Sequence, residues 1–155
     1  GVCYERAEMS FSVSSGAEAR AAAERVAEPL ALDARVRLMF LYGSAADPAR
    51  SEVRDVDLAI ACSPRLTLAD LMRLRADAVA VAGMPVDLID LADAGVVLAW
   101  EVAETGRCLF ARDPDDEAAF VTRSRARYWD FKPFLEEQWR LAGERLDERQ
   151  RGAET

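Results

Sequence analysis

The chain has 155 residues, of which 51% are hydrophobic and 31% charged, which fits a globular protein of one domain with a core of its own. Its formal net charge of −8 argues against a general binder of nucleic-acid backbones, which would need a basic face. It contains no histidine, which excludes histidine-based zinc sites, histidine general bases and hydrolases that pair serine or cysteine with histidine.

The N-terminal segment, residues 1–15, predicts a weakly structured extension. It lacks the apolar block of a signal peptide, and no apolar run approaches the roughly 20 residues that span a bilayer. The three cysteines have no paired spacing and suit a reducing compartment. We therefore expect a cytoplasmic protein without membrane contact, with one domain over residues 16–142 and a polar tail over residues 143–155.

The predicted elements follow the order α-β-β-α-β-α-β-α. Thr67 and Asp70 form a capping box that starts the second helix, Gly83 ends it, and Pro133 must interrupt or kink the last one. This order predicts an α/β (α+β) fold, with a mixed sheet of about four strands flanked by helices and a long C-terminal helical segment. The ranges are 16–30, 36–42, 56–62, 67–82, 85–91, 92–105, 107–111 and a helical region beginning at Asp113 or Asp115.

Three aspartates stand at the starts of predicted strands. Side chains alternate along a strand, so Asp55 and Asp57 point the same way, and the hydrophobic residues of that strand point into a core. Asp87 repeats this arrangement on the third strand. If these strands are neighbours in register, three carboxylates converge and repel one another unless a cation lies among them. Mg²⁺ typically binds one or two carboxylates together with substrate phosphates, so we predict a magnesium and phosphate site.

Gly43 and Ser44 follow the first strand directly and complete such a site. A glycine there lets the backbone approach a ligand, neighbouring N–H groups can bond phosphate oxygens, and the serine hydroxyl adds a donor. The simpler alternative is a turn with a serine cap and aspartates at strand edges. Composition alone would produce this Gly-Ser and Asp-x-Asp spacing in roughly a few chains per thousand, so we favour the functional interpretation.

These residues resemble the signature of the nucleotidyltransferase fold of the DNA polymerase β superfamily: Gly43-Ser44, ten residues, Asp55-Val56-Asp57 and a later strand aspartate, Asp87. The short chain and the stretch VDLIDLADAGVVLAWEVAETGRCLFARD are similar to the minimal nucleotidyltransferases called MNT or MntA. The resemblance covers about residues 20 to 140. Its first part is specific for the superfamily, and the later stretch selects the subfamily.

The resemblance implies binding of ATP or another nucleoside triphosphate with two Mg²⁺ ions, and transfer of the nucleoside monophosphate to a hydroxyl group. By this resemblance Asp55 and Asp57 would hold both metal ions. Asp87 would ligate the catalytic metal and help to deprotonate the hydroxyl, while Gly43 and Ser44 would hold the β- and γ-phosphates. Two ions that bracket an in-line displacement stabilise the attacking and the leaving oxygen.

The resemblance also implies a protein partner. MNT proteins act as antitoxins that adenylylate a tyrosine of a HEPN ribonuclease toxin, and an acidic chain fits a protein partner better than nucleic acid. The last segment carries large aromatic residues at helical spacing, whose default role is in the chain's own core. With Trp129 and Phe134 partly off that stripe, we predict that part of the segment forms a homodimer or toxin-binding surface.

One departure separates this chain from the family pattern, which often reads Gly-Ser-Arg-Ala-Arg/Lys-Gly. Here the loop reads Gly-Ser-Ala-Ala-Asp-Pro, so both basic positions are lost and Asp47 enters. Arg50 or Arg54 could replace them as phosphate contacts. The alternatives to the adenylyltransferase are a binding-only antitoxin with an inactive site, and a small-molecule nucleotidyltransferase of the aminoglycoside-modifying kind, which usually carries an additional domain.

Overall fold

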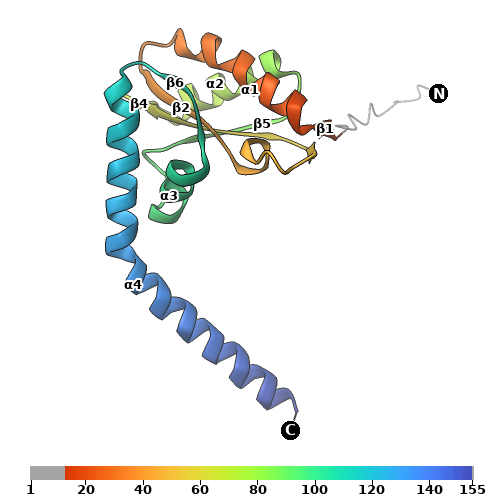
Figure 1. Cartoon of the computed structure of the whole chain (residues 1–155), viewed down its shortest axis with the longest axis vertical. Helices are drawn as coiled ribbons and strands as arrows, with labels where there is room; N and C mark the ends of the chain where they lie inside the picture. Colours follow the sequence, from red (N-terminus) through yellow and green to blue (C-terminus); the bar gives the residue numbers. More distant parts are fainter. Residues whose placement is uncertain (1–12, 155) are drawn as a thin grey trace, which may run out of the picture.

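A four-stranded sheet in the order β5-β4-β2-β6 forms the centre of the molecule, and helices cover both of its faces (Figure 1). The computed structural model describes residues 13–154, so most of the expected N-terminal extension lies outside the described residues. The predicted mixed α/β fold is confirmed. The elements are β1 (Ser14–Ser15), α1 (Gly16–Ala31), β2 (Val36–Tyr42), the 3₁₀ turn η1 (Gly43–Ala46), β3 (Glu52–Val53), β4 (Val56–Cys62), α2 (Leu68–Ala82), β5 (Val86–Asp90), α3 (Val96–Thr105), β6 (Arg107–Ala111) and α4 (Pro114–Ala153).

The strand register fixes which residues share one end of the sheet. β2 lies antiparallel to both β4 and β6. β4 and β5 are neighbours, which is the condition that the convergence of the three aspartates requires, and they run parallel. In this register Asp57 is paired with Tyr42 of β2 on one side and with Asp87 of β5 on the other. Paired residues of adjacent strands project from the same face, so these three side chains form a row across the sheet.

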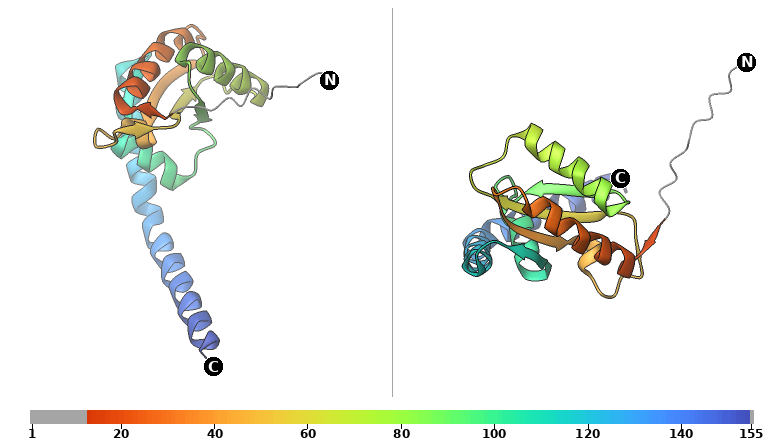
Figure 2. Two further views of the ribbon diagram at one scale, coloured as in Figure 1. Left: turned by 90° about the vertical axis from the view of Figure 1, so that its right-hand side faces the viewer. Right: turned by 90° about the horizontal axis from the view of Figure 1, so that it is seen from above.

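Each face of the sheet packs against its own pair of helices. α1 and α2 lie side by side over one face (Figure 2) and bury the strand residues Val56, Leu58 and Ile60 completely. On the other face the residues of α3 and α4 pack over Phe40, whose ring centroid lies 5.2 Å from that of Phe120. Each buried side chain of this size contributes about 1.5–3 kcal/mol. The alternation predicted for β4, with apolar residues on one face and Asp57 on the other, therefore places the carboxylate on the α3 face.

The helix ends are set by local chemistry. Thr67 and Asp70 form the predicted capping box, and Gly83 ends α2 in the left-handed conformation with φ of +66°. The prediction of a helix over 92–105 was wrong for its first four residues. The Asp90 carboxylate accepts a hydrogen bond from the Ala92 N–H at 2.9 Å, which forms a turn, so α3 begins only at Val96.

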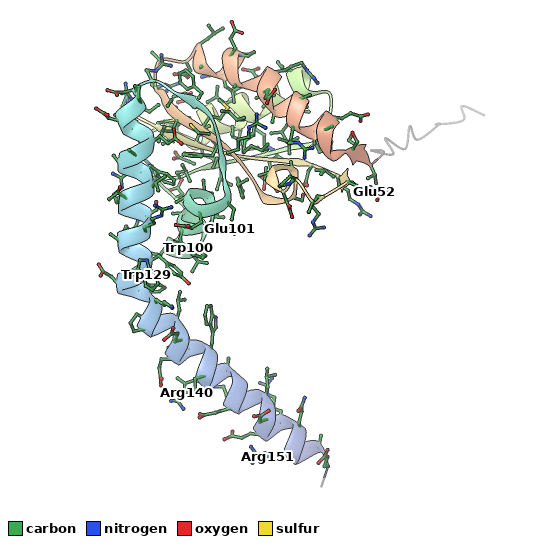
Figure 3. All side chains as sticks on the ribbon, in the orientation of Figure 1. Glu52, Trp100, Glu101, Trp129, Arg140 and Arg151 are labelled. Carbon is green, nitrogen blue, oxygen red and sulfur yellow. The ribbon has the colours of Figure 1, made fainter. Side chains whose placement is uncertain are left out.

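The last helix, α4, is 40 residues long. Asp113 caps it by accepting a hydrogen bond from the Asp115 N–H, and it continues through Pro133 and most of the expected polar tail to Ala153. It changes direction between Trp129 and Arg140 (Figure 3), the interval that contains Pro133. Beyond this bend α4 projects away from the sheet (Figures 1 and 2). Among residues 13–154, no helix combines the length and the apolar character needed to cross a membrane.

Candidate active site

The three aspartates lie together at the end of the sheet where β4 and β5 begin. Asp57 is half-buried, whereas Asp55 and Asp87 are exposed. Burial, together with the negative charges of Asp55, Asp87 and Glu101, raises the pKa of Asp57 to about 6. A carboxylate in this setting carries an electrostatic cost that a bound cation removes.

Gly43 joins the end of β2 to this carboxylate. Its φ of +68° is a left-handed conformation, and an added Cβ would lie 2.5 Å from Asp57 Oδ2. The first fact favours glycine because side chains rarely adopt this conformation, and the second means that any side chain here would displace the Asp57 carboxylate. The backbone at Gly43 therefore lies directly against Asp57, which couples the Gly-Ser turn to the aspartates.

The turn after Gly43 explains part of the departure from the family pattern. Ala45, at the first of the lost basic positions, is fully buried, so a long basic side chain has no room there without rearrangement. Asp47, at the second position, organises the loop: its carboxylate accepts a hydrogen bond from the Ala49 N–H at 2.9 Å, and its carbonyl accepts one from the Arg50 N–H at 3.1 Å.

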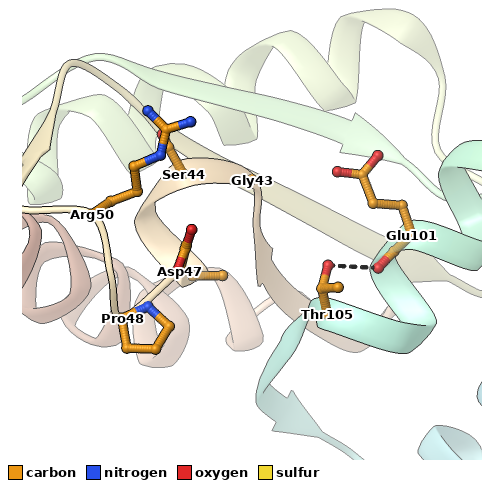
Figure 4. A pocket seen from close by; sticks show the side chains of 8 residues that line it. Gly43, Ser44, Asp47, Pro48, Arg50, Glu101 and Thr105 are labelled. Atoms are coloured by element: carbon orange, nitrogen blue, oxygen red, sulfur yellow. Dashed lines mark hydrogen bonds between the residues drawn. The ribbon is translucent and has the colours of Figure 1, made fainter.

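A pocket of about 500 Å³ opens beside the turn (Figure 4), within the range of small-molecule sites. Of the two candidate arginines, Arg50 lines it and Arg54 does not. Arg50 forms no ion pair with any residue in the described part of the chain, so its guanidinium can bind an anion. The lining residues are Gly43, Ser44, Ala46, Asp47, Pro48, Arg50, Glu101 and Thr105.

Two residues of this region were missed by sequence reasoning. Tyr42 is buried opposite Asp57, and burial together with the nearby carboxylates, Asp57 first among them, raises its pKa to about 12. Its position directly before Gly43 could have indicated that Tyr42 lies at the site. Glu101 of α3 lines the pocket and acts on Asp57 through its charge. Nothing in the sequence around Glu101 marks it as a site residue, because it reaches the site only through the tertiary packing of α3 against the sheet.

The donor set fits a divalent cation that substrate completes. As the side chains stand, residues 13–154 contain no group of three or more His, Cys, Asp or Glu that could hold a metal ion by itself. Mg²⁺ commonly takes only one or two protein carboxylates and obtains its other ligands from phosphates and water. Carboxylates at 55, 57 and 87 next to the Gly43–Ser44 turn match this chemistry.

A model of the polymerase β nucleotidyltransferase family matches residues 24–115, which is more than half of the chain. The chain belongs to the polymerase β nucleotidyltransferase family. The matched range contains all five residues of the Gly-Ser and aspartate signature, and Glu101 as well.

Solved structures share the fold of this nucleotidyltransferase at low sequence identity. A chain of the toxin–antitoxin MntA–HepT matches with a TM-score of 0.62 at 18% identity, over 77% of this chain and 98% of that chain. A toxin–antitoxin structure with AMP-PNP gives 0.64 at 21%, over 75% and 98%. A structure of tri-AMPylated Shewanella oneidensis HEPN toxin in complex with MNT antitoxin gives a TM-score of 0.62 at 20% identity, over 78% of this chain and 98% of that chain. No curated protein matched the sequence.

Proposed function

We propose that the nucleotidyltransferase is a Mg²⁺-dependent enzyme that transfers AMP from ATP to a tyrosine hydroxyl of a cognate HEPN ribonuclease toxin, and so acts as its antitoxin. The observation that carries the proposal is the register that pairs Asp57 with Asp87, next to the turn and pocket at Gly43 and Ser44. Family membership supports the reaction class. The fold shared with an MNT antitoxin bound to an AMPylated HEPN toxin supports the choice of partner.

The site residues would have three separate roles in the reaction: binding phosphate, holding metal ions and accepting a proton. Ser44, the N–H groups of the turn and Arg50 would bind the β- and γ-phosphates, and Asp55 and Asp57 would hold the metal ions. The acceptor oxygen attacks the α-phosphorus, the bond from that phosphorus to the bridging oxygen breaks, and pyrophosphate leaves. Asp87 would take the hydroxyl proton. Bound Mg²⁺ would supply charge stabilisation at the attacking and leaving oxygens.

The partner surface is proposed to be the part of α4 from Trp129 onward, which comprises the bend and the projecting half. The stripe predicted to be this chain's own core is buried only at Phe120, while Trp129 and Trp139 are each 61% exposed. The Lys132 ammonium lies 4.6 Å from the Trp129 ring centroid, which holds that aromatic side chain in place. Exposed, positioned tryptophans are frequent anchors of protein interfaces.

Intact-mass measurement tests the proposal. The cognate HEPN protein is incubated with Mg²⁺, ATP and the nucleotidyltransferase. We expect its mass to rise by AMP units, and no rise with the double variant D55N/D57N. The matched control is D77N, because Asp77 is an exposed carboxylate of α2 on the opposite face of the sheet.

A binding-only antitoxin is the second candidate, and one observation favours it. At position 47, where the family pattern often has a basic residue, the loop places an aspartate in the pocket lining. A stable complex with the HEPN protein but no mass gain would reject the enzyme and support this second function.

A further inference from the structure

The pocket has two chemically different walls. One wall carries the donors of the Gly43–Ser44 turn, the guanidinium of Arg50 and Asp47, whose carboxylate already accepts a hydrogen bond from the Ala49 N–H. The other wall is formed by Glu101 and Thr105 of α3. Figure 4 shows the Glu101 carboxylate on the opposite side of the pocket from Arg50. A ligand that fills this space must therefore be anionic at one end and present hydrogen-bond donors at the other.

Glu101 is the acceptor that the second wall offers. Its side chain makes no hydrogen bond or ion pair with any residue of the described chain. The neighbouring Glu104 is occupied by Arg125, at 2.5 Å. The Thr105 hydroxyl is occupied too, because it donates to the Glu101 backbone carbonyl at 2.9 Å. An ionised carboxylate accepts hydrogen bonds and cannot donate them, so it selects for donors on the ligand.

A nucleoside triphosphate has this polarity. Its phosphates are repelled by Glu101 and attracted to Arg50, so the nucleoside end is directed toward α3. The two oxygens of a carboxylate can accept from the two hydroxyls of a ribose, and acidic residues bind ribose hydroxyls in other nucleotide sites. Asp55 and Asp87 act on Asp57 more strongly than Glu101 does, which is consistent with a place for Glu101 outside the group of three aspartates.

We propose that Glu101 binds the ribose hydroxyls of the nucleotide and makes the enzyme selective for ribonucleotides over deoxyribonucleotides. This inference rests on the proposed function, because it requires a nucleoside triphosphate in the pocket. It assigns Glu101 a specificity role that is separate from the chemistry at the aspartates.

Calorimetric titration tests it by comparing affinities as ratios. With Mg²⁺ present, we expect the wild type to bind ATP at least tenfold more tightly than 2′-deoxy-ATP or 3′-deoxy-ATP, and E101A to bind all three about equally. E104A is the matched control and should keep the wild-type ratio, since Glu104 belongs to the same helix but does not line the pocket. E101Q provides a second, nearly isosteric variant in case E101A fails to fold, and we expect it to weaken the preference as well.

The outcomes separate the inference from the function on which it rests. If the wild type binds ATP but does not discriminate against the deoxynucleotides, or if E101A keeps the discrimination, the assignment of Glu101 is overturned. ITP, which lacks the adenine amine, is the further arm. If E101A abolishes a preference for ATP over ITP and leaves the ribose preference intact, Glu101 reads the base and the ribose assignment is overturned. A wild type that binds no nucleotide at all would overturn the proposed function as well.

Discussion

At the scale of single residues, the site depends on one contact between backbone and side chain. Gly43 is held in a left-handed conformation directly against the Asp57 carboxylate, so a change at either residue is felt by the other. Asp57 in turn is half-buried among three further carboxylates, and burial together with their charges raises its pKa above the ordinary range. The residues proposed to bind phosphate and metal are therefore mechanically and electrostatically coupled.

Replacement of Gly43 by alanine tests the mechanical coupling. We expect G43A to lose Mg²⁺-dependent ATP binding at least tenfold and to lower the free energy of unfolding by about 1–3 kcal/mol, because the new Cβ strains the turn and displaces Asp57. Calorimetry and urea unfolding measure the two effects. G95A is the control, since a Cβ at Gly95 meets nothing within 4 Å. Equal behaviour of the two variants would contradict the coupling.

The electrostatic coupling predicts a pH dependence of stability in metal-free protein. The pKa of Asp57 is 3.8 ordinarily and about 6 in the folded state, so folded protein binds more protons between these values and its stability falls as pH rises from 4 to above 6. D57N removes this cost. Because Asp57 is only half-buried, we expect D57N to be more stable than wild type by on the order of 1 kcal/mol at pH 7.5.

The same comparison at pH 4 should give little difference, because Asp57 is then protonated in the folded protein. Urea unfolding in the presence of EDTA measures both points. D77N, which removes an exposed carboxylate on the opposite face of the sheet, controls for the loss of one negative charge as such. A D57N effect that does not change with pH would show that the carboxylate's charge is not the source of the cost.

Arg50 provides a residue-scale test of the altered loop. We expect R50Q to weaken binding of Mg²⁺-ATP about tenfold, which is about 1.4 kcal/mol. Binding of AMP should weaken less, because the proposed partners of Arg50 are the β- and γ-phosphates, which AMP lacks. R54Q is the matched control, as Arg54 lies in the same loop but outside the pocket lining. Calorimetry with ATP and AMP distinguishes these cases. An R54Q effect equal to that of R50Q would indicate general charge attraction instead.

At the scale of elements, α4 consists of two functionally different halves. Its first half is tied to the sheet by Phe120, which packs against Phe40, and to α3 by Tyr128, whose ring stacks on Trp100 at 4.2 Å. Its second half, beyond the bend, projects from the body and carries Trp139, which is mostly exposed. Helices in proteins derive most of their stability from tertiary packing. Because most side chains of the second half are exposed, its surface is available to pack against a partner.

This division predicts opposite effects for two substitutions on one helix. We expect F120A to lower the free energy of unfolding by about 3–5 kcal/mol, because it leaves a cavity under α4. W139A should leave stability within about 0.5 kcal/mol and weaken binding to the HEPN partner at least tenfold. Chemical unfolding and a pull-down titration measure the two effects. A truncation after Asp130 that keeps full partner binding would contradict the proposed surface.

At the scale of the whole molecule, sequence patterns predicted those structural elements whose formation depends on residues adjacent in the chain. β2, β4 and β6 occur over the predicted residues, because continuous apolar runs ended by glycine or polar loops define strands locally. The start of α3 was not predictable in this way, since the side chain of Asp90 converts the first residues into a turn.

The residues of the site likewise differ in whether local sequence patterns could predict their positions. Alternation along two strands predicted the faces on which Asp57 and Asp87 lie, whereas their pairing depended on the two strands being neighbours, which the structure supplies. Glu101 could not be predicted to lie at the site, because its sequence context is that of an ordinary polar helix position and only tertiary packing brings it to the pocket. The exposure of Trp139 was equally inaccessible, since helical spacing of aromatic residues does not reveal whether another element covers them.

The short pairing of β1 with β3 has a consequence for the entropy of ligand binding. Ser14 and Ser15 pair with Val53 and Glu52, and the Gly16 N–H donates to the Ser51 carbonyl at 3.0 Å. The segment that carries Arg50 is thereby anchored to the start of α1 before any ligand arrives. Ordering a residue costs about 1–2 kcal/mol, a cost that folding has already met for this segment. Nucleotide binding should consequently proceed with little loss of backbone freedom in this loop.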